Sequence, residues 1–128
     1  MTVLGIGTDI VECLRIAQMI ERHGELFINR VYTDHEIEYC SRRKAATQHY
    51  AGRWAAKEAV LKALGTGWAR GISWRDVEVF SEKGGKPSIR LDGTAQEVSR
   101  RLGISSMLIS ISHCRSHATA YALALGNE

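Results

Sequence analysis

Hydrophobic and polar positions alternate with two different periods along the chain, and these periods predict where its strands and helices lie. Alternation with a period of two, or a short apolar run, is typical of a strand, whereas apolar spacings of three and four are typical of a helix. In chain order the expected elements are a strand over 3–9, helices over 11–23, 34–41 and 46–64, strands over 77–80 and 88–91, a helix over 94–102, and strands over 107–112 and 119–125. This order predicts an α+β fold with a mainly antiparallel sheet packed against a long central helix.

Turn and capping residues separate these elements. Gly24 ends the first predicted helix, and Thr33 with Glu36 has the spacing of a capping box that begins the second. Residues 67–71 are expected to form a loop, and the sequence Lys-Gly-Gly-Lys-Pro at 83–87 is typical of a hairpin turn.

Composition narrows the class of protein. A chain of 128 residues that is 45% hydrophobic, with a single proline, predicts one folded domain spanning 1–128. No apolar run approaches the roughly 18 residues of a membrane span, and no basic segment precedes an apolar stretch at the N-terminus. Cys13, Cys40 and Cys114 lack the spacing of a disulfide framework or zinc site. We therefore expect a cytoplasmic protein with reduced thiols and no membrane partner.

The net charge of +3 is mild, but the cations are unevenly distributed. Arg15, Arg22 and Arg30 lie near the start, and a basic run occupies 42–44. Such clusters attract an anionic partner, which could be a protein, a nucleotide or a nucleic acid.

The central helix carries the first candidate site. Glu58 and Lys62 are one turn apart and share a face, while most of the remaining surface of this helix is apolar. Two interpretations remain open: a modest Glu–Lys pair with Gly65 as the C-cap, or an anion site in which both charges take part.

Asp9 is the second candidate, because Gly5 and Gly7 lie on the same strand face and leave room for another group to approach closely. The spacing from Asp9 to Glu12 fits a capping box, so Asp9 is either a helix cap or a ligand of Mg²⁺ together with Glu58. The Gly-Thr-Gly stretch at 65–67 follows a helix and is no Walker loop. A phosphate there has to rely on Lys62, Arg53, the metal or backbone N–H groups.

His113 lies near the end of a predicted strand, and it is either a buried, hydrogen-bonded histidine or a donor to an anionic ligand. Trp54, Trp68 and Trp74 are expected to be core or interface aromatics rather than platforms for stacked bases. A non-catalytic protein that binds nucleotides or nucleic acid through its basic residues is the rival interpretation. Such a protein gains nothing from burying Asp9 and Glu58 close to anions.

Motifs spread in order over nearly the whole chain resemble those of the holo-[acyl-carrier-protein] synthases, a family in the 4′-phosphopantetheinyl transferase superfamily. The matching stretches read GIGTDIVE at 5–12, AGRWAAKEA at 51–59 with KALGTG at 62–67, GKP at 85–87, and SISH at 110–113. Their combination at compatible spacing makes the resemblance far more specific than any one of them.

The resemblance implies a transferase of fatty acid biosynthesis. It implies that 4′-phosphopantetheine passes from coenzyme A to a serine of apo-acyl carrier protein, with release of adenosine 3′,5′-bisphosphate. By the same likeness Asp9 and Glu58 bind Mg²⁺, and Lys62 contacts the transferred phosphate or the leaving oxygen. Glu58, or water held by the metal, is the implied general base.

The resemblance also implies the partners and their sites. The residues implied to contact coenzyme A are Arg53, Lys62, Gly65, Thr66, Gly67, Lys86, Pro87 and His113. Relatives of this length form homotrimers with active sites between subunits, so these residues are expected to come from two neighbouring chains. Arg15, Met19 and Arg22 are implied to dock the acidic carrier protein, and no nucleic-acid partner is expected.

The chain departs from the family pattern at a few positions. Trp54 and Trp68 stand where Phe and Ile are more frequent, and Cys114 stands where a Thr often follows the histidine. None of these changes touches Asp9 or Glu58, so they bear on coenzyme A affinity rather than on the reaction class.

Overall fold

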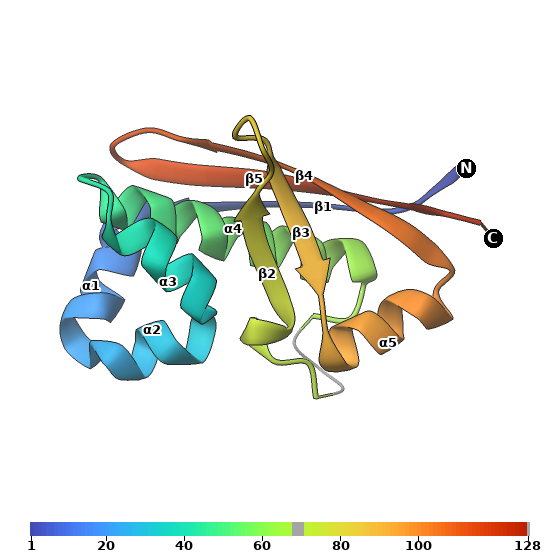
Figure 1. Ribbon diagram of the computed structural model, residues 1–128, viewed down its shortest axis with the longest axis horizontal. Coiled ribbons are helices and arrows are strands. Elements are labelled where there is room, and N and C mark those ends of the chain that lie inside the picture. The colour runs from blue at the N-terminus through green and yellow to red at the C-terminus, as the bar shows by residue number, and fades with distance from the viewer. Residues whose placement is uncertain (68–70, 128) are drawn as a thin grey trace.

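A computed structural model describes residues 1–67 and 71–127. A three-stranded sheet forms one layer, the long helix α4 (Ala46–Leu64) crosses beneath it, and the remaining elements cover the other side of α4 (Figure 1). The expected α+β fold with antiparallel pairing and a long central helix is confirmed.

The sheet has the order β1 (Thr2–Glu12), β5 (His117–Gly126) and β4 (Ile104–His113), and both pairings are antiparallel. Each strand places alternate residues against α4. The inward positions of β5 are all alanines that are buried: Ala118, Ala120, Ala122 and Ala124. The outward face of the sheet carries large apolar side chains that are exposed to solvent, among them Ile6, Ile10 and Tyr121.

The small inner residues let α4 lie against the backbone of the sheet. A Cβ atom on Gly7 would lie 1.9 Å from the carbonyl oxygen of Ala59, and one on Gly5 would lie 2.1 Å from that of Ala63. Both distances are far inside van der Waals contact, so only glycine fits at either position. The close approach predicted at these glycines is therefore made by α4 itself.

The opposite side of α4 is covered by short elements. They are α1 (Cys13–His23), α2 (Glu25–Val31), α3 (Asp34–Ser41), the hairpin of β2 (Val77–Ser81) and β3 (Pro87–Leu91), a 3₁₀ turn η1 (Trp74–Asp76), and α5 (Gly93–Arg101). Trp54 stacks on Trp74 with ring centroids 4.3 Å apart, and both rings pack against the core as expected. Trp68 lies outside the described residues.

The interpretation of Asp9 as a helix cap is wrong. Strand β1 continues to Glu12, Asp9 pairs with Ala120 in mid-strand, and α1 begins only at Cys13, without a side-chain cap. The pairing with β5 holds this segment extended, so the capping-box spacing from Asp9 to Glu12 is never used. The predicted first strand was therefore too short, and the predicted first helix began too early.

Helix α2 was not predicted. Gly24 adopts a φ of 52°, which turns the chain sharply so that a new helix begins at the next residue. By contrast, the capping box of Thr33 and Glu36, the bounds of α4 and the hairpin all agree with expectation. Within the described part of the chain, no helix is long and apolar enough to cross a membrane.

We expect Gly7→Ala to lower the free energy of unfolding by about 3 kcal/mol, because its new Cβ would overlap the backbone of α4. Urea denaturation of the purified variant measures this. Thr8→Ala, at the neighbouring exposed position, is the matched control and should cost less than about 1 kcal/mol. Equal stability of the two variants would contradict the tight contact.

Candidate functional site

Asp9 lies on the inner face of β1 and meets Lys62 of α4. The ammonium of Lys62 is 3.2 Å from Oδ1 of Asp9 and donates to the carbonyl oxygen of Thr8 at 2.9 Å. The Asp9 side chain is 16% exposed and that of Lys62 is 54% exposed, so the pair is accessible from solvent. Its ion pair is too exposed to add much stability, and it leaves a carboxylate directed at a cation.

Glu58 is brought to the same level by the register of β1 against α4. Gly5 packs over Ala63 and Gly7 over Ala59, so two strand residues correspond to one helical turn in the opposite direction. Asp9 therefore lies beside the turn that precedes Ala59, and this turn contains Glu58. Because helix side chains lean toward the N-terminus, Lys62 reaches back over that turn to Asp9. The fold thus brings Asp9 together with Lys62, and Glu58 lies on the adjacent turn of α4.

A second polar cluster surrounds Arg53. Its side chain is buried, its guanidinium carbon lies 4.0 Å from the centre of the Tyr39 ring, and its Nε has no hydrogen-bond partner among the described residues. Arg43 contacts the same ring at 3.3 Å. Burial raises the pKa of Tyr39, but the Ser81 hydrogen bond and the charges of Arg53 and Arg43 outweigh burial and hold it below the usual value. The cluster is strongly electropositive.

Two histidines border this cluster. The His49 and His113 rings lie 5.1 Å apart, edge to face, and Nδ1 of His113 donates to Oε1 of Gln48 at 2.9 Å. Burial, then the charges of His113, Arg53 and Arg43, lower the pKa of His49, so its imidazole is neutral at pH 7. His113 is exposed, which contradicts the buried alternative and leaves its ring accessible to a ligand.

The two clusters lie on different sides of α4. Arg53 and Glu58 are five residues apart, which turns their side chains about 140° from one another around the helix axis. We refer to the two clusters as the Asp9 half-site (Asp9, Glu58, Lys62) and the Arg53 half-site (Tyr39, Arg43, His49, Arg53, His113).

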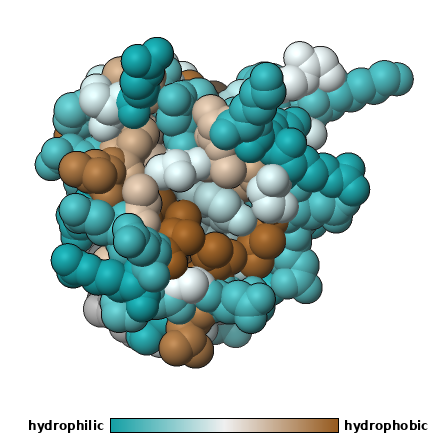
Figure 2. Space-filling view, turned by 90° about the vertical axis from the view of Figure 1, so that its left-hand side faces the viewer, coloured by the Kyte–Doolittle hydropathy of each residue, from teal (hydrophilic) through white to brown (hydrophobic). Residues whose placement is uncertain are grey.

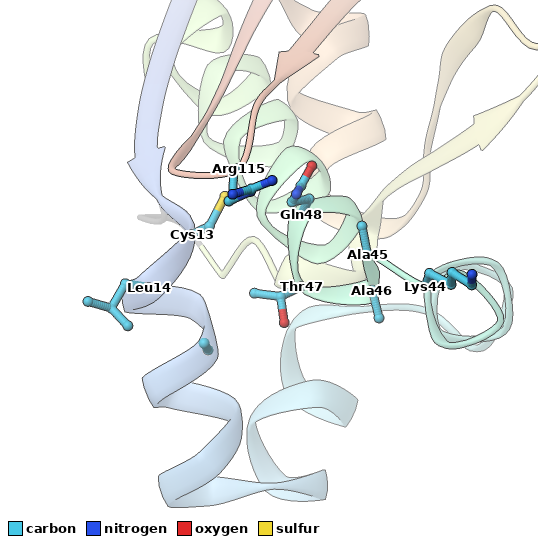
Figure 3. Close-up of a pocket in the computed structure, with 9 residues that line it drawn as sticks. Cys13, Leu14, Lys44, Ala45, Ala46, Thr47, Gln48 and Arg115 are labelled. Atoms are coloured by element: carbon cyan, nitrogen blue, oxygen red, sulfur yellow. The ribbon is translucent and has the colours of Figure 1, made fainter.

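A hollow of about 430 Å³ opens beside the Arg53 half-site, between the start of α1 and the start of α4 (Figure 3). Gln48 and Arg115 lie at its upper edge, and Lys44 lies on its far rim. None of Asp9, Glu58 or Lys62 lines it.

The remaining predicted coenzyme A residues occupy two turns. Gly65 caps α4 with a φ of 78°, and its N–H donates to the carbonyls of Leu61 and Lys62; Thr66 and Gly67 follow. Lys86 is exposed in the hairpin turn, and Pro87 begins β3. Part of the loop predicted at 67–71 lies outside the described residues. Among those described, no group of three or more His, Cys, Asp or Glu side chains forms a metal-ligand cluster.

The predicted docking residues lie on α1. Arg15 and Arg22 are exposed and Met19 is half-buried. Figure 2 shows the side of the molecule that carries α1, α2 and α3, where hydrophobic residues gather at the centre and hydrophilic residues surround them. This face combines an apolar centre with a polar rim.

The family model described as the 4′-phosphopantetheinyl transferase superfamily matches residues 5–125, which is nearly the whole chain. The chain belongs to this superfamily. The matched range includes both half-sites, α1 and the hairpin turn.

Individual relatives match this chain over nearly their whole length. The chain is 48% identical over 120 residues to a holo-[acyl-carrier-protein] synthase of Protochlamydia amoebophila, and the match covers 94% of this chain and 96% of the relative. It is 44% identical over 123 residues to that of Rhodopirellula baltica, covering 96% and 98%.

Solved structures share the fold. The holo-[acyl-carrier-protein] synthase of Neisseria meningitidis superposes with a TM-score of 0.88 at 32% identity, covering 97% of this chain and 99% of that one. The enzyme of Helicobacter pylori, solved in complex with coenzyme A, superposes with a TM-score of 0.83 at 31% identity, covering 94% and 99%.

The sequence did not predict the buried ion pair between Lys57 of the central helix and Glu36. Lys57, beside Glu58, has no exposed surface, and its ammonium lies 2.8 Å from Oε1 of the equally buried Glu36. Burial lowers the pKa of Lys57, while the charge and hydrogen bond of Glu36 oppose that shift. The signal was present, since Lys57 falls among apolar residues on the helix and Glu36 was already recognised as part of a capping box. Tyr39, Arg43 and His49 were also missed, because no local pattern brings them together.

Proposed function

We propose that this transferase moves 4′-phosphopantetheine from coenzyme A to a serine hydroxyl of an apo-acyl carrier protein and releases adenosine 3′,5′-bisphosphate, in a Mg²⁺-dependent reaction. The observation that carries the proposal is the Asp9 half-site, in which Asp9 forms an ion pair with Lys62 beside the turn of α4 that carries Glu58. The names of the relatives, and the coenzyme A bound to the Helicobacter pylori enzyme, support it.

The donor set of the Asp9 half-site fits Mg²⁺. This ion takes one or two carboxylates and completes its shell with water and substrate phosphate oxygens, so Asp9 and Glu58 are sufficient protein ligands. Asp9 already directs Oδ1 at a cation, the ammonium of Lys62. When bound, the ion supplies charge neutralisation at the diphosphate.

The reaction has a defined place for each side chain. The serine Oγ attacks the phosphorus that bears the pantetheine, and the bond from this phosphorus to the bridging oxygen breaks. Glu58 accepts the serine proton as general base. Lys62 turns from Asp9 to the phosphates and balances the negative charge that develops on the leaving oxygen.

The Arg53 half-site binds the nucleotide end of coenzyme A. Arg53 presents a buried guanidinium whose Nε lacks a partner, and an arginine in that state favours a phosphate. Exposed His113 adds a donor, Lys86 and Pro87 lie in the nearby hairpin turn of the family motif, and Gly65, Thr66 and Gly67 approach the nucleotide from the end of α4. The 3′-phosphate is the group best matched to this cluster.

The active form is a homotrimer in which the Asp9 half-site of one chain faces the Arg53 half-site of its neighbour. Two observations support this assembly. The half-sites lie on different sides of α4, and the outer sheet face leaves Ile6 and Ile10 each 68% exposed and Tyr121 57% exposed. Together with Leu108 and Leu123, Ile6 and Tyr121 line an apolar hollow of about 260 Å³. Apolar surface of this kind is typical of a subunit interface.

Glu58→Gln should abolish transfer, by about 100-fold or more, because the amide neither accepts the serine proton nor binds the metal well. Mass spectrometry of an apo-carrier incubated with coenzyme A and Mg²⁺ measures the gain of one phosphopantetheine group. Glu97→Gln, on the exposed face of α5, is the matched control and should transfer normally. Failure of the wild-type chain to load an authentic carrier would refute the proposed function, and activity in Glu58→Gln would remove Glu58 from the mechanism.

Mixing two inactive variants should restore activity if sites are shared. Glu58→Gln damages one half-site and His113→Asp the other, so random mixed trimers contain intact sites at about a quarter of positions. The measurement is the transfer rate after the variants are dissociated and reassembled together. A mixture as inactive as its components would contradict the shared site.

Changing Arg15 and Arg22 to Glu should raise the KM for the carrier about tenfold or more, and should leave the KM for coenzyme A unchanged, because these side chains face an acidic partner. Changing Arg100 and Arg101 on α5 to Glu alters the net charge equally and should leave both constants near the wild-type values. Steady-state kinetics at two salt concentrations measure both. An equal loss for both substrates would show that α1 has only a structural role.

A further inference from the structure

The buried ion pair of Glu36 and Lys57 joins four elements. Both side chains are fully buried. The ammonium of Lys57 donates to the Glu36 carboxylate and to the carbonyl oxygens of Trp74, at 3.1 Å, and Val77. Three donors therefore have three acceptors, and α4 is bonded directly to α3, η1 and β2.

The carboxylate of Glu36 is satisfied as completely as the ammonium. Its Oε1 accepts the N–H of Thr33 at 2.8 Å and its Oε2 accepts the N–H of Val79 at 2.7 Å. Neither charge can reach a substrate, because both are sealed in the core. Any contribution to the reaction must pass through the position of α4.

The two sides of α4 hold the helix in different ways. On the sheet side, Gly5 and Gly7 pack on Ala63 and Ala59 and fix the level of the helix, and Lys62 bonds to Asp9 and Thr8 through a side chain that is 54% exposed. On the opposite side, the buried bonds of Lys57, the residue next to Glu58, tie α4 to three further elements. These directional bonds are well placed to oppose rotation of the helix at Glu58.

We propose that Glu36 and Lys57 are a positioning pair that holds the rotation of α4 from the side opposite the sheet, so that Glu58 faces Asp9. The inference rests on the proposed function and deepens it, since it assigns a role in metal binding to residues outside the site. Because the pair also bonds four backbone groups, its effect on stability has to be measured separately from its effect on the site.

The test compares Glu36→Leu/Lys57→Met with Tyr32→Phe. The double change removes both charges at similar volume. The control removes another buried hydrogen bond to α4, from the Tyr32 hydroxyl to the carbonyl of Tyr50 at 2.8 Å, two turns away from Glu58. Urea unfolding, steady-state transfer kinetics and Mn²⁺ binding followed by electron paramagnetic resonance with coenzyme A present are measured for each.

The double variant should have a lower urea midpoint than the wild type, because four backbone groups lose their partners; in the folded protein kcat should fall about 10–100-fold and Mn²⁺ affinity about tenfold. The KM for the carrier should not change, because α1 is untouched. Tyr32→Phe should have a lower urea midpoint with wild-type kcat and Mn²⁺ affinity. A folded double variant with wild-type kcat and Mn²⁺ affinity would overturn the proposal.

If the double variant does not fold, Glu36→Gln provides a second test of the positioning pair. Glutamine keeps the shape and can still accept one of the two backbone N–H bonds, but it loses the charge that holds Lys57. Its kcat and Mn²⁺ affinity should both fall, and wild-type values for both would overturn the proposal. A wild-type chain that transfers nothing would instead remove the proposed function on which the inference rests.

Discussion

The close contact between α4 and the sheet is the constraint on which the rest of the molecule depends. Glycines on β1 and alanines along β5 remove the side chains that would otherwise separate the two layers. The backbone of α4 therefore packs directly against the backbone of the strands. This close packing brings Asp9 on β1 within reach of Lys62 on α4. A normal helix-to-sheet spacing would leave this carboxylate isolated at the edge of the sheet.

The same helix divides the chemistry of the chain into two parts. One side carries Glu58 and Lys62 toward Asp9, and another carries Arg53 toward Tyr39 and Arg43. This separation and the exposed apolar face of the sheet are the two observations that support the proposed trimer.

Two buried cations on α4 differ in how completely the fold satisfies their donors. Each N–H that the Lys57 ammonium can donate has an acceptor, and one of these acceptors is a carboxylate. No donor of Lys57 is left for a ligand. Arg53 is nearly as buried, yet its Nε has no partner among the described residues and no carboxylate forms an ion pair with it there. The unsatisfied cation is the one suited to an incoming anion, because binding then supplies the missing partner.

The sequence by itself determined the α+β class, the bounds of the long helix, the capping box of Thr33, the hairpin, and the family, because these depend on local periodicity and on motifs that are contiguous in the chain. Only the tertiary structure decided that Asp9 lies in mid-strand, since pairing with β5 overrides its local capping pattern. The tertiary structure likewise paired Lys57 with Glu36 and gathered Tyr39, Arg43 and His49 around Arg53. These contacts join residues far apart in the chain, and no local preference encodes which distant side chains the packing will bring together.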